Sequence, residues 1–125
     1  MARTPYIAGN WKMHKTVSEA RVLASELVSE LSGASAKLMI APPFTALSAV
    51  AQVVSDSPIR LGAQNMAPEE SGAHTGEVSV TMLADVGVEV VILGHSERRH
   101  VYGETDELIN RKVKLALAHE MEVIL

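Results

Sequence analysis

Short apolar runs alternate along the chain with longer stretches in which apolar residues recur at helical spacing. The apolar runs predict buried strands, which are expected over residues 6–9, 37–41, 60–65, 89–94 and 123–125. Strand starts recur at intervals of roughly thirty residues, the size of a strand–helix–strand unit. Regular alternation of this kind predicts an α/β fold with a parallel sheet and right-handed crossovers.

Start and stop signals place helices between these strands. Thr16-Val17-Ser18-Glu19 is a capping box, and an apolar stripe runs from Val17 to Leu31 before Gly33 ends the helix. Further helices are expected over residues 44–54 and 80–86, and a longer one after Thr105-Asp106, with its apolar stripe at residues 108–117. Because Ser96 and Glu97 directly follow the fourth strand, they predict a short helix there as well.

Polar side chains lie at or just beyond the carboxyl ends of three of the predicted strands. They are Asn10 and Lys12, then Gln64 and Asn65, and finally His95. Functional residues of parallel α/β folds gather at the carboxyl ends of the strands, so this placement predicts one shared site. At the start of a helix a neutral imidazole is favoured over a charged one, and it can polarise a carbonyl. A lone histidine in this position is also consistent with a purely structural, hydrogen-bonded role.

Five motifs together resemble one family closely. They are AGNWKM at residues 8–13, APPFTAL at 41–47, LGAQN at 61–65, GAHTGEVS at 72–79 and ILGHSERR at 92–99. In this order they resemble triosephosphate isomerase, and the resemblance runs from Tyr6 to Leu125. It implies a (β/α)8 barrel, and interconversion of glyceraldehyde 3-phosphate and dihydroxyacetone phosphate in glycolysis and gluconeogenesis, without a cofactor or a metal.

The resemblance also implies roles for individual residues. Lys12 would be the cation that contacts the phosphate and the substrate oxygens, and Asn10 would help to fix the substrate. His95 would be the electrophile that moves protons between the two oxygens, and Glu97 would support Lys12 and the proton transfers. Lys12 as an ordinary surface lysine, and Glu97 as no more than an ion-pair partner, are the competing interpretations.

Residues 66–79 form the longest predicted loop and allow three interpretations. Glycines at 72 and 76 permit unusual backbone angles, but their spacing fits neither the dinucleotide nor the Walker phosphate motif. A mobile surface loop is the simplest alternative. The resemblance implies instead a loop that enters the neighbouring subunit of a homodimer, with Thr75 near the partner's Lys12 and Glu77 paired with the partner's Arg98.

The length of the chain indicates how much of a barrel it can form. A complete (β/α)8 barrel takes about 250 residues, whereas this chain has 125 and stops within the apolar run Glu122–Leu125. We therefore expect a single domain, residues 1–125, made of four strand–helix units and the start of a fifth strand: the N-terminal half of such a barrel. A flattened, doubly wound parallel sheet and a segment-swapped dimer are the alternatives.

In this family the general base and the phosphate-binding glycine loops lie in the second half of the barrel. The resemblance therefore implies that the chain alone has little or no isomerase activity. A non-catalytic half-barrel that assembles with itself through its free strand edges is the alternative function.

Composition excludes several other classes of protein. A net charge of -4 argues against a general nucleic-acid binder, and the absence of cysteine excludes disulfides and thiolate metal sites. No apolar run approaches the ~20 residues of a membrane span, and no secretory signal is recognisable. A nucleotide-binding module is disfavoured because no strand leads into a matching glycine motif. We expect a soluble cytoplasmic protein.

Overall fold

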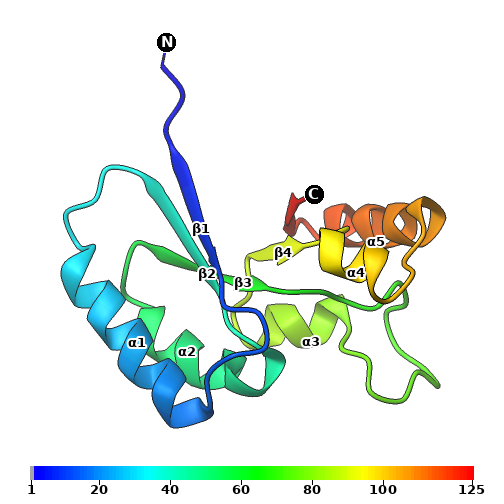
Figure 1. Cartoon of the computed structure of the whole chain (residues 1–125), viewed down its shortest axis with the longest axis horizontal. Coiled ribbons are helices and arrows are strands. Elements are labelled where there is room, and N and C mark those ends of the chain that lie inside the picture. Colours follow the sequence, from blue (N-terminus) through cyan, green and yellow to red (C-terminus); the bar gives the residue numbers. More distant parts are fainter. Residues whose placement is uncertain (1) are drawn as a thin grey trace.

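Five parallel strands form one sheet, and their order across the sheet is the order in which they occur in the chain. This arrangement comes from a computed structural model that describes residues 2–125 (Figure 1). The strands are β1 (Tyr6–Asn10), β2 (Lys37–Ala41), β3 (Ile59–Ala63), β4 (Val90–Ile92) and β5 (Glu122–Ile124). The helical elements are α1 (Val17–Glu30), η1 (Phe44–Ala46), α2 (Leu47–Val54), α3 (Val80–Asp85), α4 (Ser96–His100) and α5 (Asp106–Ala118).

The predicted elements are all present, and their boundaries differ by a few residues. The sequence predicts that the third strand runs to Asn65, but β3 ends at Ala63, so Gln64 and Asn65 lie beyond it. The predicted helix over residues 44–54 begins with the 3-10 turn η1. The capping box of α1 is confirmed, since the Thr16 side chain accepts a hydrogen bond from the Glu19 backbone and the Glu19 carboxylate accepts one from the Thr16 backbone.

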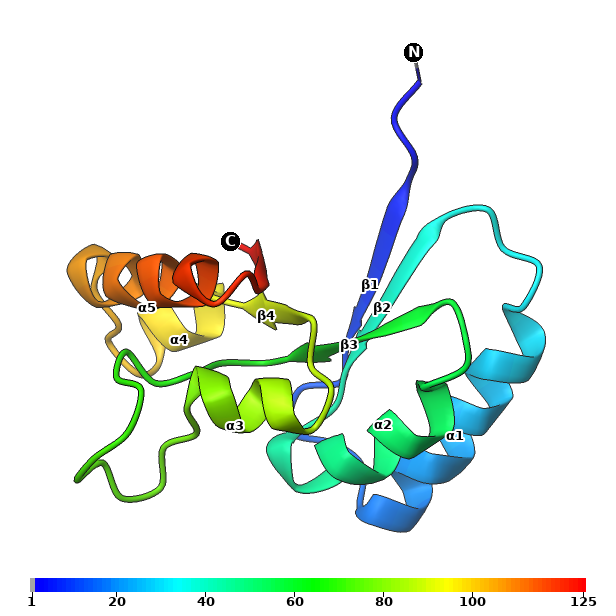
Figure 2. The ribbon, with the colours of Figure 1, turned by 180° about the vertical axis from the view of Figure 1, so that it is seen from behind.

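Helices cover a single face of the sheet, which curls as a half-barrel does (Figures 1 and 2). Alternate strand residues such as Leu38, Ile40 and Leu61 share one apolar core with Ala24 of α1 and Leu83 of α3. A doubly wound sheet would bury helices on both faces and reverse its strand order at a switch point. The sequential order and the single helical layer therefore exclude the flattened alternative.

The opposite face of the sheet carries a small second core, which corresponds to the interior of the barrel. Met39 on β2 packs with Val90 and Ile92 on β4, although β3 lies between these two strands. The Met39 thioether lies directly over Gly62 of β3, in the space that a Cβ atom would occupy. A residue without a side chain on β3 thus lets β2 and β4 make contact across the curled sheet.

Arg60 links three strands at the opposite end of the sheet from the predicted site. Its guanidinium pairs with Glu89, just before β4, at 2.8 Å, and with Glu122 on β5. Hydrogen bonding from Arg60 lowers the pKa of Glu122 against the opposing effect of burial. Burial, together with the nearby Glu122 carboxylate, raises the pKa of Tyr6 on β1. Groups from β1, β3 and β5 therefore lie close to one another inside the curl.

Replacing Gly62 with alanine is expected to lower the free energy of unfolding by about 1–2 kcal/mol, because the buried Met39 side chain must shift. Urea unfolding followed by circular dichroism measures this change. Gly33→Ala is the matched control, since open space surrounds Gly33, and it should change stability by less than about 0.5 kcal/mol. Equal effects of the two substitutions would contradict the packing of Met39 over β3.

Candidate active site

A cavity of about 220 Å³ opens at the carboxyl ends of the strands. It is lined by the residues to which the resemblance assigns catalytic or substrate-binding roles: Asn10, Lys12, His95 and Glu97. They come from the end of β1 and from the start of α4, segments more than eighty residues apart in sequence that the parallel sheet brings to one edge. The remaining wall includes Gln64 and Asn65 beyond β3, and Phe44 beyond β2.

Lys12 is held in a conformation that lysine seldom adopts. Its φ of 55° lies in the left-handed region, where a side chain is disfavoured and where strain often accompanies function. Two hydrogen bonds stabilise this turn. The Lys12 backbone N–H donates to Asn10 Oδ1 at 2.9 Å, and Gln64 Nε2 donates to the Lys12 carbonyl at 2.9 Å. The Gln64 amide also donates to the carbonyl of Ala41, so it ties the turn to β2.

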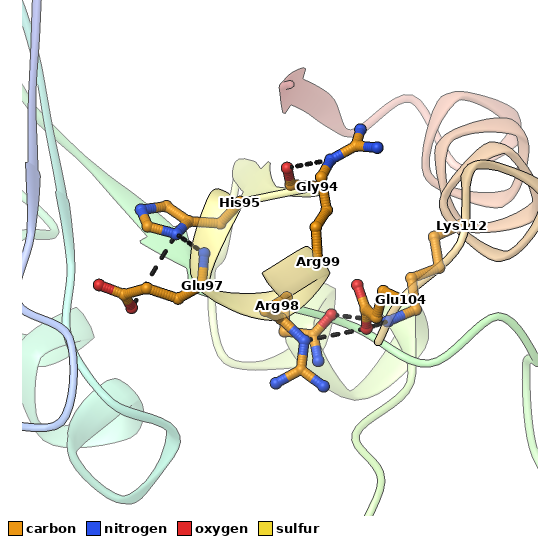
Figure 3. Close-up of polar contacts among 8 residues, drawn as sticks. Gly94, His95, Glu97, Arg98, Arg99, Glu104 and Lys112 are labelled. Carbon is orange, nitrogen blue, oxygen red and sulfur yellow. Dashed lines mark hydrogen bonds and ion pairs between the residues drawn. The ribbon is translucent and has the colours of Figure 1, made fainter. Parts of the chain in front are cut away.

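His95 is the N-cap residue of α4, and its side chain faces the Glu97 backbone (Figure 3). The backbone N–H of Glu97 donates to His95 Nδ1 at 3.1 Å. A nitrogen that accepts a hydrogen bond carries no proton, so the neutral ring holds its proton on Nε2. His95 can therefore donate a hydrogen bond from Nε2, as the predicted electrophile requires.

Glu97 connects Lys12 with His95. Its carboxylate forms an ion pair with the Lys12 ammonium at 2.5 Å, and its second oxygen lies 3.9 Å from His95 Nδ1. Hydrogen bonding from Lys12 lowers the pKa of Glu97, against a smaller opposing effect of burial. The lysine ammonium is thus aligned by a carboxylate that stays ionised at neutral pH.

The predicted interface residues lie outside this cluster or at its edge. Thr75 and Glu77 are exposed on the loop over residues 66–79. That loop is anchored by an ion pair between Glu69 and Arg111 of α5, and by a contact of 2.6 Å between Glu70 and His119, which follows α5. Figure 3 shows Arg98 bound within its own chain, where Nε donates to Glu104 at 2.9 Å. Their roles in a dimer interface stay predictions.

A buried ion-pair network supports the site, and the sequence did not reveal it. Lys112 on α5 has a side chain that is only 2% exposed, and its ammonium contacts Glu104 at 2.6 Å and Asn65 Oδ1 at 2.9 Å. Figure 3 shows Glu104 between Lys112 and Arg98 of α4. The network therefore fixes α4, which carries His95 and Glu97, against α5 and the end of β3. The one available signal was spacing, because Lys112 falls three residues after Ile109 in the predicted apolar stripe.

The charges within this network decide the protonation of Glu104. Burial acts to raise the pKa of its carboxyl, but the hydrogen bonds and charges of Lys112 and Arg98 outweigh it and lower the pKa. Glu104 is consequently a carboxylate in the folded chain, although its side chain is only 5% exposed.

Residues 2–125 contain no cluster of three or more histidine, cysteine or acidic side chains placed to hold a metal ion. They also contain no helix that is long and apolar enough to cross a membrane.

The chain matches the sequence model of the family described as triosephosphate isomerase over residues 5–125. It is 63% identical over 120 residues to triosephosphate isomerase of Treponema denticola, a match that covers 96% of this chain and 48% of the relative. It is 55% identical over 123 residues to the Chloroflexus aurantiacus protein of the same name, covering 98% of this chain and 49% of that protein. The chain belongs to the triosephosphate isomerase family.

The chain spans about half the length of the curated relatives it matches. Its curled sheet of five parallel strands corresponds to the N-terminal half of a TIM barrel. The expected fold is thereby confirmed.

Proposed function

We propose that this chain forms the N-terminal part of a triosephosphate isomerase active site. The observation that carries the proposal is the convergence of Lys12, His95 and Glu97 on one cavity, with the ammonium paired to Glu97 and His95 Nδ1 accepting from the Glu97 backbone. The substrates would be glyceraldehyde 3-phosphate and dihydroxyacetone phosphate, in the glycolytic and gluconeogenic pathway of the cytoplasm. Membership of the family supports this assignment.

The proposed reaction moves a proton between adjacent carbons through an enediolate. It needs a base to remove the carbon-bound proton, donors to stabilise charge on oxygen, and a cation for the phosphate. Lys12 supplies the cation and Asn10 helps to orient the substrate. His95 donates from Nε2 to the oxygen on which charge develops. Glu97 acts as a positioning residue for the Lys12 ammonium.

The base is the part that this site does not supply. Among residues 2–125, Glu97 is the carboxylate that lines the cavity, and it is engaged by Lys12. A carboxylate held at a low pKa by a cation is a poor acceptor for a carbon-bound proton. We infer that the base and the remaining phosphate contacts belong to the other half of a family barrel.

Purified residues 1–125 are accordingly expected to isomerise glyceraldehyde 3-phosphate no faster than Lys12→Ala prepared in the same way. A coupled assay at high protein concentration measures both. Turnover by the unaltered chain that disappears in Lys12→Ala would show that these residues contain a base, and would contradict the proposal of a half-site.

We further propose that the loop over residues 66–79 docks into a second copy of the chain, which places Thr75 near the partner's catalytic cavity. Anchoring of the loop by Arg111 and His119 supports this proposal, because a preformed loop loses less entropy on binding. Thr75→Arg is expected to shift the chain from dimer to monomer in analytical ultracentrifugation. Ser71→Arg, in the same loop, serves as a control. A sedimentation profile that is the same for both variants would contradict this interface.

A further inference from the structure

Gly94, the residue before His95, adopts a left-handed backbone conformation with a φ of 68°. Glycine has several backbone conformations open to it, so local sterics do not fix the direction of the peptide that joins Gly94 to His95. A Cβ atom at Gly94 would lie 2.7 Å from Arg99 Nη2 and 3.2 Å from Ile109 Cγ2. The missing side chain therefore leaves the room in which the Arg99 guanidinium packs against this turn.

Arg99 holds the carbonyl of that peptide. Its Nε donates to the Gly94 carbonyl at 2.7 Å, the short distance that is typical of a charged donor (Figure 3). Its Nη1 donates to Asp106 Oδ1 at 2.5 Å, at the start of α5. The Arg99 side chain is 32% exposed, so both contacts are partly shielded from water. One guanidinium thus ties the turn before His95 to the next helix.

The remaining hydrogen bonds around His95 come from the backbone of α4. The His95 carbonyl accepts from the N–H groups of Arg98 and Arg99 at 2.9 and 3.1 Å, and Nδ1 accepts from the Glu97 N–H at 3.1 Å. These bonds hold the imidazole to its own helix. They do not fix the peptide through which the chain passes from β4 into that helix, which is the peptide whose carbonyl Arg99 binds.

We propose that Arg99 is a positioning residue for His95. By holding the Gly94 carbonyl, it fixes the Gly94–His95 peptide and with it the place of the imidazole on the wall of the cavity. Arg99 acts through His95 and not by contact with the substrate. This role rests on the proposed function, in which His95 Nε2 donates to the oxygen on which charge develops.

Arg99→Met tests the role directly, because methionine keeps an apolar stem and removes every donor of the guanidinium. The histidine ring nitrogens and the backbone amides of the 15N-labelled chain are followed by NMR at mildly alkaline pH. We expect the His95 ring signals to move toward the average of the two neutral tautomers. The Glu97 amide proton should shift upfield as its hydrogen bond to Nδ1 weakens.

A misplaced imidazole should also weaken ligand binding. Dihydroxyacetone phosphate is expected to bind Arg99→Met roughly threefold to tenfold more weakly than the unaltered chain, which corresponds to the loss of one neutral hydrogen bond. Isothermal titration calorimetry measures this difference. The ring signals are read without ligand, so absence of binding by the unaltered chain would contradict the proposed function and would leave the positioning role to be decided by NMR.

Two further variants separate positioning from general stability. Asp106→Asn removes the ion pair and keeps the contact with Gly94, so it should leave the His95 signals and the affinity unchanged. Arg99→Lys keeps the positive charge, but a lysine ammonium lacks the planar fork that reaches both acceptors, so it should move the His95 signals as well. It also provides the reading if Arg99→Met does not fold. Unchanged His95 and Glu97 signals in a folded Arg99 variant, or equal changes in Asp106→Asn, would overturn the proposal.

Discussion

Glu104→Gln is expected to lower the free energy of unfolding by about 3–5 kcal/mol, the cost of leaving a buried charge without its partner. Glutamine keeps the shape of the side chain, so the substitution removes charge alone. Lys112, whose side chain is 2% exposed, would then face only the amide oxygen of Asn65 and that of the new glutamine. Urea unfolding at pH 7 measures the loss, with the exposed Glu107→Gln of α5 as the control.

A double variant separates charge from packing. Glu104→Gln combined with Lys112→Met removes both buried charges, and it should recover much of the stability that Glu104→Gln alone loses. Equal instability of the single and double variants would indicate that shape at this position matters more than charge.

The same carboxylate predicts a pH dependence. Its pKa is lower in the folded chain than in the unfolded chain, where glutamate titrates near ~4.3. The folded state therefore gains stability from Glu104 above that pH, and loses it as the pH falls through the folded-state pKa. The unaltered chain should consequently lose more stability on acidification below about pH 4.5 than Glu104→Gln does. Parallel curves for the two proteins would contradict the assignment of Glu104 as a carboxylate in the folded chain.

Lys12→Met is expected to weaken binding of dihydroxyacetone phosphate by roughly tenfold to a hundredfold. A hydrogen bond to a charged group contributes about 1.5–3 kcal/mol, and methionine keeps the length of the side chain without its charge. Isothermal titration calorimetry at low ionic strength measures the affinity. Lys114→Met removes the same charge from an exposed position on α5 and should leave the affinity unchanged. Similar affinities for Lys12→Met and Lys114→Met would exclude Lys12 as the phosphate-binding cation.

Much of the fold was predictable because its signals are local. Thr16 and Glu19 lie three residues apart and form the predicted capping box, and Thr105 caps α5 by accepting from the Leu108 backbone at 3.2 Å. The meeting of Lys12 with His95 was predictable for a different reason. The carboxyl ends of parallel strands lie at one edge of the sheet. Once the strands are predicted, the polar residues at their ends are therefore expected to lie close together.

The features that escaped prediction depend on contacts between distant segments. The left-handed turn at Lys12 is stabilised by Gln64, which lies 52 residues away in sequence. Lys112 falls three residues after Ile109 in the apolar stripe of α5, but its contact with Asn65, 47 residues away, could not be read from that spacing. The packing of Met39 over Gly62 could not be predicted, because strands buried on both faces show no alternation of apolar and polar residues that would tell which face each side chain occupies.

The proposed function requires the cavity between Lys12 and His95 to bind a triose phosphate. A titration of the 15N-labelled chain with dihydroxyacetone phosphate, followed by two-dimensional NMR, tests it most directly, with unphosphorylated dihydroxyacetone as the control. We predict saturable shifts in the backbone amides of Lys12, His95 and Glu97 that are absent with the control and lost in Lys12→Met. Shifts confined to other surfaces, or no saturable shift at these three residues, would contradict the account.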